Sequence, residues 1–245
     1  MSQLVSDREA GDCETPLRKK PRKESDYVGI EISEYEEPRF ARFLVGPSEK
    51  EFTIHCGSLK GLSQYFCALV EGQIREASEG VVKWPHVDND TFSRFAEFVY
   101  TGEYNNPQIY RRSSRTRVPS HDDLVAHLRL AVLADSYDIS ALEKLAMDKL
   151  LKSCDLLYKS MDWPGQAMEP ALSGKSPYGP ETLVEFVKLC YDPNELVPGK
   201  ILDKVSGWIK MHPKGLGSSE ELRDAINSSH RLAAALCEGL LSKHK

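Results

Sequence analysis

Two short segments rich in hydrophobic and β-branched residues, 43–46 and 51–54, predict β-strands. Pro47 and Ser48 stand between them, and these residues favour a turn, so the pair predicts a β-hairpin. A third short strand is expected at 81–84, where two valines and a tryptophan gather.

Between and after these strands, apolar residues recur every three or four positions, which is the period of an α-helix. The first such segment is expected to be one helix that Gly72 ends, with Tyr65 beside its apolar stripe. The stripe consists of Leu59, Leu62, Phe66 and Leu69. The next helix follows the capping residue Asp88 and ends at Gly102. Its aromatic face has a spacing typical of a core, and we interpret Trp84 as a core residue too.

Helical periodicity returns from residue 124 and continues to the C-terminus. One helix is predicted over 124–137, and Ser140 and Glu143 have the capping-box spacing that begins another. Ser218 and Glu221 repeat this spacing. The apolar positions expected to face inward after residue 180 are Leu183, Val187, Cys190, Ile201, Val205, Trp208, Ile209, Leu222, Ile226, Leu232, Leu236 and Leu240.

Composition along the chain predicts four parts. Residues 1–26 are polar and charged, so we expect a disordered tail, because such a segment buries too little surface to offset its ordering entropy. Residues 27–154 are expected to form one domain with an exposed loop at 105–123. Residues 155–179 are rich in proline and glycine and predict a linker, and 180–245 predict a helical C-terminal region.

Two short basic runs have more than one interpretation. The run in the N-terminal tail resembles a nuclear localisation signal, and a solvated charge run is the alternative. Its cationic residues are Arg18, Lys19, Lys20, Arg22 and Lys23. In the second run, Arg111 precedes Ser114 by three residues, a spacing that basophilic kinases favour. We prefer a solvated loop there, because such short patterns recur by chance.

The chain has 245 residues and a net charge of −5, so it lacks the overall positive charge of a nucleic-acid-binding protein. No apolar run is long enough for a membrane span, and the N-terminus has no hydrophobic leader. The six cysteines are scattered, which is typical of reduced thiols. We therefore expect an intracellular protein, nuclear or cytoplasmic or both, that contacts neither membrane nor nucleic acid directly.

Residues with catalytic or metal-binding chemistry are present but poorly placed for it. His55 and Cys56 are neighbours on a predicted strand, so their side chains point to opposite faces and cannot form a nucleophilic pair. His121 and His127 are six residues apart, which does not place both on one helical face. No phosphate-binding glycine motif is present. We expect no enzyme, no metal and no cofactor.

The order of elements from Phe40 to Cys154 resembles the BTB/POZ domain, and the C-terminal part resembles that of fungal BTB-domain proteins without kelch repeats or zinc fingers. The resemblance implies an α+β fold, a helical cluster with a small β-sheet, followed by a helical C-terminal region. It assigns family-pattern structural roles to His55, Ser63, Phe66, Tyr100 and Gly102. Many members carry an aspartate where this chain reads 39–42 as Arg-Phe-Ala-Arg, so we do not expect the charged pocket that some transcriptional repressors use.

The same resemblance implies a protein–protein interaction module rather than a catalyst. Members of the family form homodimers, and some bind cullin scaffolds as substrate adaptors of ubiquitin ligases. We expect partner contacts near Tyr65, at the turn from Trp84 to Asp88, and on the helix hairpin after Leu124, with Phe66 directed inward. The alternative is a nuclear scaffold or transcriptional regulator without a ligase role.

Overall fold

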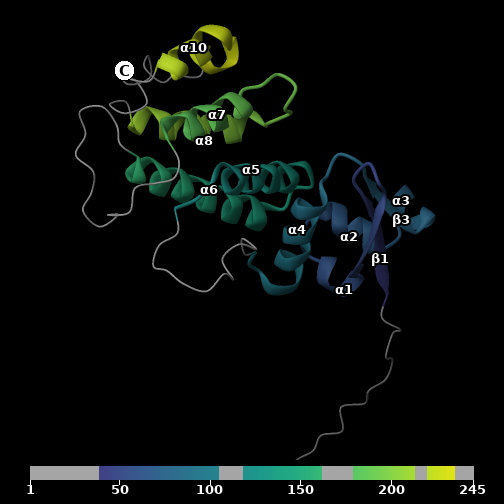
Figure 1. Ribbon diagram of the computed structural model, residues 1–245. Helices are drawn as coiled ribbons and strands as arrows, with labels where there is room; N and C mark the ends of the chain where they lie inside the picture. The colour runs from purple at the N-terminus through teal and green to yellow at the C-terminus, as the bar shows by residue number, and fades with distance from the viewer. Residues whose placement is uncertain (1–38, 105–117, 162–178, 213–219, 235–245) are drawn as a thin grey trace, which may run out of the picture. The chain divides into compact units, whose positions relative to one another are not determined.

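The computed structural model describes residues 39–104, 118–161, 179–212 and 220–234, and Figure 1 shows how their helices and strands are arranged. All of them belong to one structural unit that begins at Pro38. The elements are β1 (Phe40–Val45), β2 (Lys50–His55), α1 (Cys56–Leu59), α2 (Gln64–Val70), α3 (Arg75–Glu79), β3 (Val81–Trp84), α4 (Asn89–Thr101), α5 (His121–Ser136), α6 (Ser140–Ser160), α7 (Pro180–Cys190), α8 (Gly199–Met211) and α10 (Glu220–Ser228).

The three strands form a mixed sheet in the order β2-β1-β3. β1 and β2 are antiparallel, with Phe43 opposite Phe52, and this confirms the predicted hairpin. β3 is parallel to β1, with Phe43 opposite Val82, so α1, α2 and α3 lie in the crossover between β2 and β3. The predicted α+β class is confirmed.

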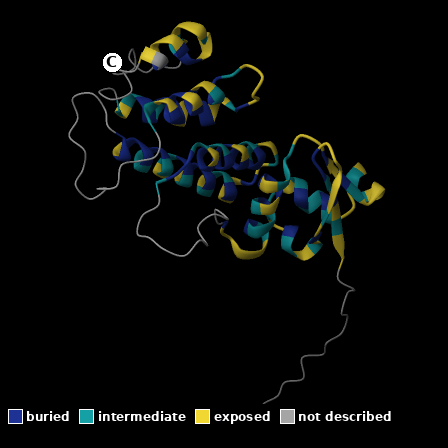
Figure 2. Cartoon of the chain, viewed as in Figure 1, coloured by how far each residue is buried: buried dark blue, intermediate teal, exposed yellow. Residues whose placement is uncertain are grey.

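An aromatic core lies between this sheet and the helices. The Phe43 ring centroid is 5.1 Å from that of Trp84 and 5.2 Å from that of Phe92, and Phe66 stacks on Phe95 at 5.7 Å. All five side chains are at most 2% exposed. Figure 2 shows the buried residues concentrated where the helices face one another and the sheet. The interpretation of Trp84 as a core residue is therefore confirmed.

The segment predicted as one helix after the hairpin is divided into α1 and α2. Lys60 is extended, Gly61 has a φ of +90°, and Ser63 is extended again with a φ of −161°. A φ of +90° is accessible to glycine at little cost, so Gly61 allows the chain to change direction between the two helices. Gly72 follows α2 with a φ of +77°, in agreement with its predicted role.

The ends of α4 and α5 are set by local capping. The Asp88 side chain accepts a hydrogen bond from the Thr91 backbone, and Gly102 ends α4 in the left-handed conformation. α5 begins at His121 instead of Leu124, because Ser120 and Asp123 form a reciprocal capping box. The last residues of the predicted exposed loop are therefore helical, while 105–117 lie outside the described residues.

The predicted capping box of Ser140 and Glu143 is not formed. Ile139 is the N-cap of α6, no side chain caps this helix, and Glu143 instead accepts a hydrogen bond from Lys200 at 2.7 Å. The helix continues to Ser160, so the predicted linker starts inside α6. The rest of that linker up to residue 178, and the caps predicted at 218 and 219, lie outside the described residues.

α7 packs against α5 and α6, α8 packs against α6, and α10 packs against α7, and these helices share one hydrophobic core with the rest of the unit. Lys200 of α8 lies 2.6 Å from Asp135 of α5 as well as close to Glu143 of α6. Trp208 of α8 donates from its indole nitrogen to Asp155 of α6 at 2.5 Å. Of the positions predicted to face inward, those from Leu183 to Leu222 and Leu232 are buried, and Ile226 is half-buried. Leu236 and Leu240 lie outside the described residues.

Candidate functional site

Tyr65 and Phe66 are neighbours on α2 that point in different directions. Phe66 is fully buried, as predicted, whereas Tyr65 is half-buried at the edge of the core. The Tyr65 ring packs on the Phe66 ring, with centroids 5.1 Å apart. It also packs on the ring of Tyr137, the C-cap residue of α5, with centroids 4.9 Å apart. The structure thus brings the Tyr65 position of α2 together with the helix hairpin that follows Leu124.

Tyr137 occupies this place because of how α5 ends. Asp138 adopts a φ of +53°, and the Ile139 backbone N–H donates back to the Ala134 carbonyl at 2.8 Å. This arrangement ends the helix and anchors Ile139 in the core. The Tyr137 ring then lies 4.6 Å from that of Trp84, over the end of β3.

The two tyrosines are neutral hydrogen-bonding groups. Burial raises the pKa of the Tyr65 hydroxyl, and Tyr137 and Glu76 add to this effect. Burial and Glu76 raise the pKa of Tyr137 to about 12. Among the described residues no hydrogen bond to either hydroxyl is found, so both remain able to bond a partner.

An ion pair lies further along α5 from Tyr137. Arg129 of α5 lies two helical turns before Tyr137, and its Nη1 is 3.3 Å from the Asp88 carboxylate. Burial works to raise the pKa of Asp88, but hydrogen bonds from Thr91 and the charge of Arg129 together lower it. Asp88 is therefore ionised, and it joins the turn after β3 to α5.

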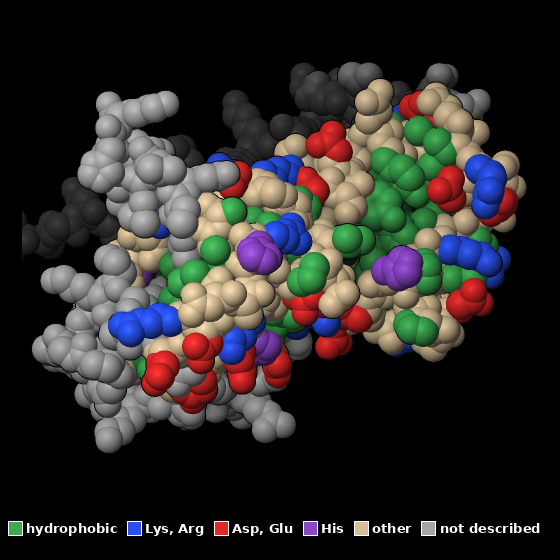
Figure 3. All heavy atoms as spheres, turned by 90° about the horizontal axis from the view of Figure 1, so that it is seen from above, with side chains coloured by type: hydrophobic (Ala, Val, Ile, Leu, Met, Phe, Trp, Pro, Cys, Tyr) green, Lys and Arg blue, Asp and Glu red, His purple; other side chains and the backbone are tan. Residues whose placement is uncertain are grey.

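We call these five residues, Tyr65, Glu76, Asp88, Arg129 and Tyr137, the Tyr65 surface. They come from α2, α3, the β3–α4 turn and α5 with its C-cap. Figure 3 shows hydrophobic side chains gathered on the part of the molecule that contains the sheet and α2, with charged groups around them. Half-buried aromatics bordered by charges are typical of protein–protein contact sites, where tyrosine and arginine are enriched.

One residue expected to contact a partner is placed differently. The Trp84 side chain is 2% exposed, so it supports Tyr137 from below and does not reach the surface itself. Tyr137 and Arg129 lie in the helix hairpin after Leu124, where partner contacts were expected, but neither residue was singled out. Their places in the Tyr65 surface depend on contacts between distant residues, such as that of Asp88 with Arg129, which are 41 residues apart. No local sequence pattern indicates such a contact.

The family-pattern residues form a second group, at the junction of β2 and α1. His55 is the last residue of β2 and the N-cap of α1, and Tyr100 near the end of α4 hydrogen-bonds its backbone and its ring. The His55 ring also lies 4.4 Å from that of Phe40. Phe40 and Tyr100 are 49% and 51% exposed, so the three rings form an exposed aromatic cluster.

Ser63 and Gly102 lie at helix ends. Ser63 is the N-cap of α2, but its side chain makes no capping hydrogen bond, and its hydroxyl is buried without a partner among the described residues. Gly102 has a φ of +73°, which favours glycine at this position. The basic residues 18–23, predicted as a localisation signal, and the pair Arg111 and Ser114 lie outside the described residues.

The histidines considered for a metal site have other environments. His127 is buried, and its Nδ1 is 2.8 Å from the Tyr104 hydroxyl, while His121 lies at the start of α5 near Asp122. Within the described ranges, no group of three or more histidine, cysteine or acidic residues could hold a metal ion. In the same ranges, no helix is both long and apolar enough to cross a membrane.

Residues 41–154 match the family model of the BTB/POZ domain. This range covers β1 to most of α6 and includes the Tyr65 surface, and its end agrees with the resemblance inferred from sequence. The segment is therefore a BTB/POZ domain, which is a protein–protein interaction domain and not an enzyme family. No match to a curated protein was found.

Proposed function

We propose that this protein is a non-catalytic adaptor whose BTB/POZ domain binds a cullin-type ubiquitin-ligase scaffold through the Tyr65 surface. The observation that carries the proposal is the contact of the Tyr65 and Tyr137 rings, whose centroids are 4.9 Å apart, with the pair of Asp88 and Arg129 two helical turns earlier on α5. The three regions in which we expect partner contacts are joined here by the contacts of Tyr65 with Tyr137, Tyr137 with Trp84 and Arg129 with Asp88. The two hydroxyls, which bond no other described residue, and the half-buried rings give such a partner both polar and apolar contacts.

The C-terminal helices fit the second half of an adaptor. They are attached rigidly to the domain, because Lys200 bridges Asp135 and Glu143 and because α7 packs on both α5 and α6. A second protein held by α7, α8 or α10 is thereby kept in a fixed orientation to the first. A flexible tether would hold it less efficiently.

Self-association is part of the proposal. The exposed cluster of Phe40, His55 and Tyr100 supports it, because exposed aromatic side chains in mutual contact are favourable at interfaces between proteins. Sedimentation of the full chain should give a homodimer. Replacement of Phe40 by Ser should shift the equilibrium toward the monomer. A monomeric wild-type protein would contradict the proposed self-association.

The adaptor proposal is tested by mass spectrometry of proteins that co-purify with the tagged chain from its native cells. A cullin should be recovered with the wild type and lost with Tyr65→Ala and with Arg129→Glu, provided that circular dichroism shows both variants folded. The matched control is Lys152→Glu, an exposed position on α6 away from the surface. Recovery without any cullin would reject the proposal.

The alternative is a nuclear scaffold or transcriptional regulator without a ligase role. It is supported by the basic run that includes Arg18, Lys19, Lys20, Arg22 and Lys23. On this alternative, replacing these residues by glutamine abolishes nuclear localisation, and chromatin or transcription proteins are recovered in place of a cullin.

A further inference from the structure

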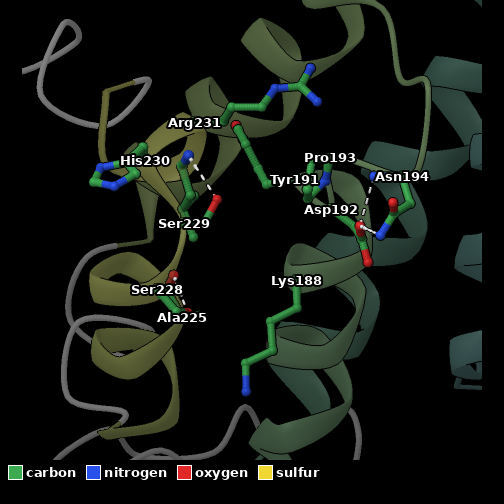
Figure 4. Close-up of a pocket in the computed structure, with 11 residues that line it drawn as sticks. Lys188, Tyr191, Asp192, Pro193, Asn194, Ala225, Ser228, Ser229, His230 and Arg231 are labelled. Atoms are coloured by element: carbon green, nitrogen blue, oxygen red, sulfur yellow. Dashed lines mark hydrogen bonds between the residues drawn. The ribbon is translucent and has the colours of Figure 1, made fainter.

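A cavity of about 510 Å³ lies in the C-terminal region, away from the BTB/POZ segment, between α7 and α10. Its walls come from the end of α7, the loop that follows, the end of α10 and the short helix at 230–234, as Figure 4 shows. The innermost side chains are Tyr191, Ala225 and Leu232, each at most 2% exposed. The floor of the cavity is therefore apolar but already well covered, and its open rim is hydrophilic.

Two cations of the rim have no acidic partner among the residues that the structure describes. Figure 4 shows the Lys188 side chain extending from α7 along the gap toward α10, with Arg231 at the opposite end. In the part of the chain that the structure describes, no carboxylate pairs with Lys188 or Arg231; Arg231 makes one long bond, 3.5 Å, to the Val197 carbonyl. The His230 ring points away from the cavity.

The acid on the rim is already engaged. Asp192 accepts hydrogen bonds at Oδ1 from both the backbone and the side-chain nitrogen of Asn194, at 2.8 and 2.9 Å. These bonds hold the loop after α7 in a turn and direct the carboxylate to the loop itself. Because Asn194 is neutral, these bonds leave the formal charge of Asp192 in place, and Lys188, Arg231 and Asp192 together give the lining a formal charge of +1.

We propose that this cavity binds a segment of a partner protein that carries a large apolar side chain next to a carboxylate. The apolar side chain packs into the cavity above Tyr191, Ala225 and Leu232, and the carboxylate bonds Lys188, with Arg231 adding positive charge at the opposite end. The volume is within the range of sites that enclose small ligands or a few side chains. Charge-assisted bonds at the rim fix the orientation of the segment.

Both features of the segment are required by the site. A purely acidic segment would leave the space above the apolar floor unfilled, and a purely apolar one would desolvate Lys188 without a partner, which is costly. The inference deepens the proposed adaptor function, because it names the surface for the second protein. Its biological role rests on that function, but binding at the cavity is measured without any ligase scaffold.

The test is fluorescence anisotropy with the full chain and short labelled peptides that carry a leucine flanked by two glutamates. We expect saturable binding that weakens with salt. A peptide with glutamines for the glutamates, and one with serine for the leucine, should each bind at least about tenfold more weakly, which corresponds to about 1.4 kcal/mol. Equal binding of either control peptide, or no binding of the probe, overturns the proposal.

Two variants locate the binding. Lys188→Glu should weaken binding of the probe about tenfold, whereas Lys152→Glu, the same charge change on an exposed position of α6, should leave it within about twofold. Ser228→Trp fills the mouth of the cavity without a change in charge and should also abolish binding. If Lys152→Glu weakened binding as much as Lys188→Glu, the effect would come from the net charge of the protein, and the proposed binding site would be rejected. A dimer that Lys188→Glu converts to monomer, without peptide binding, would assign the cavity to a second copy instead.

Discussion

The Tyr100 hydroxyl joins the end of α4 to the last residue of β2 through two bonds to His55. The His55 backbone N–H donates to it at 3.1 Å, and His55 Nδ1 lies 2.9 Å from it. Since the hydroxyl accepts the backbone proton, its own proton is free for Nδ1. Two positions of the BTB/POZ pattern, 45 residues apart, thus hold the sheet and α4 together.

Removing this hydroxyl should cost stability. Tyr100→Phe deletes both bonds while it keeps the ring, so we expect a loss of about 1 kcal/mol in the free energy of unfolding, measured with urea. Tyr65→Phe is the matched control, because no hydrogen bond to its hydroxyl is found in the described part of the chain. If the two variants lose the same stability, the Tyr100–His55 contact has no special structural role.

Stability should depend on pH through His127. Burial lowers the pKa of this histidine from 6.5 to about 4; nearby Asp123 opposes the shift, and Lys149 and Arg94 add to it. Between these values the unfolded chain binds a proton that the folded chain does not. The free energy of unfolding should therefore fall by about 3 kcal/mol from this residue as pH drops from 6.5 toward 4.

The contribution of His127 is isolated by comparison with His127→Gln, which cannot titrate. Urea unfolding of both proteins at several pH values should give curves that converge as pH falls, with the steeper loss in the wild type. Parallel curves would show that His127 titrates alike in the folded and unfolded states.

Lys200 should stabilise the attachment of α8. Hydrogen bonds to Asp135 and then to Glu143 raise its pKa, so it stays charged between two carboxylates. Lys200→Met leaves these acids facing each other and should lower the free energy of unfolding by about 1 kcal/mol. Lys204→Met removes only a 3.8 Å contact with Glu143 and should have a smaller effect. High salt should reduce the difference, and a salt-independent difference would argue against an ionic origin.

The BTB/POZ segment should not be stable without the C-terminal helices. α6 buries Leu157 and Tyr158 in the shared core, and the Tyr158 ring lies 6.2 Å from that of Trp208 of α8. A chain that ends at Met161 uncovers this apolar face. We expect it to aggregate or to bind a hydrophobic dye strongly, as followed by size-exclusion chromatography and dye fluorescence. A monodisperse, cooperatively unfolding fragment would show that the two parts are independent.

The features that the sequence predicted well depend on neighbouring residues. The hairpin, the short strand at 81–84, the Asp88 cap and the Gly102 end all follow from side chains within a few positions of one another. The inward direction of Phe66 follows from helical period in the same way. The BTB/POZ resemblance rests on the order of these local features, which is why it agrees with the matched range.

The features that were missed depend on distant pairs. Glu143 does not complete a capping box at Ser140, because Ile139 takes the N-cap position and Ser140 is already the first helical residue; the Glu143 carboxylate instead bonds Lys200 of α8. The break between α1 and α2 overrides a continuous apolar stripe, since the chain must turn at Gly61 to place Phe66 over the sheet. The pairing of Tyr65 with Tyr137 joins residues that only the folded chain brings together.

The most direct measurement is the affinity of the purified full-length protein for a purified cullin, determined by isothermal titration calorimetry for the wild type, Arg129→Glu and Lys152→Glu. If the Tyr65 surface is the contact, the wild type and Lys152→Glu bind alike, and Arg129→Glu, still folded, binds at least about tenfold more weakly. Equal affinity of all three proteins, or no binding by the wild type, would contradict a cullin contact at this surface.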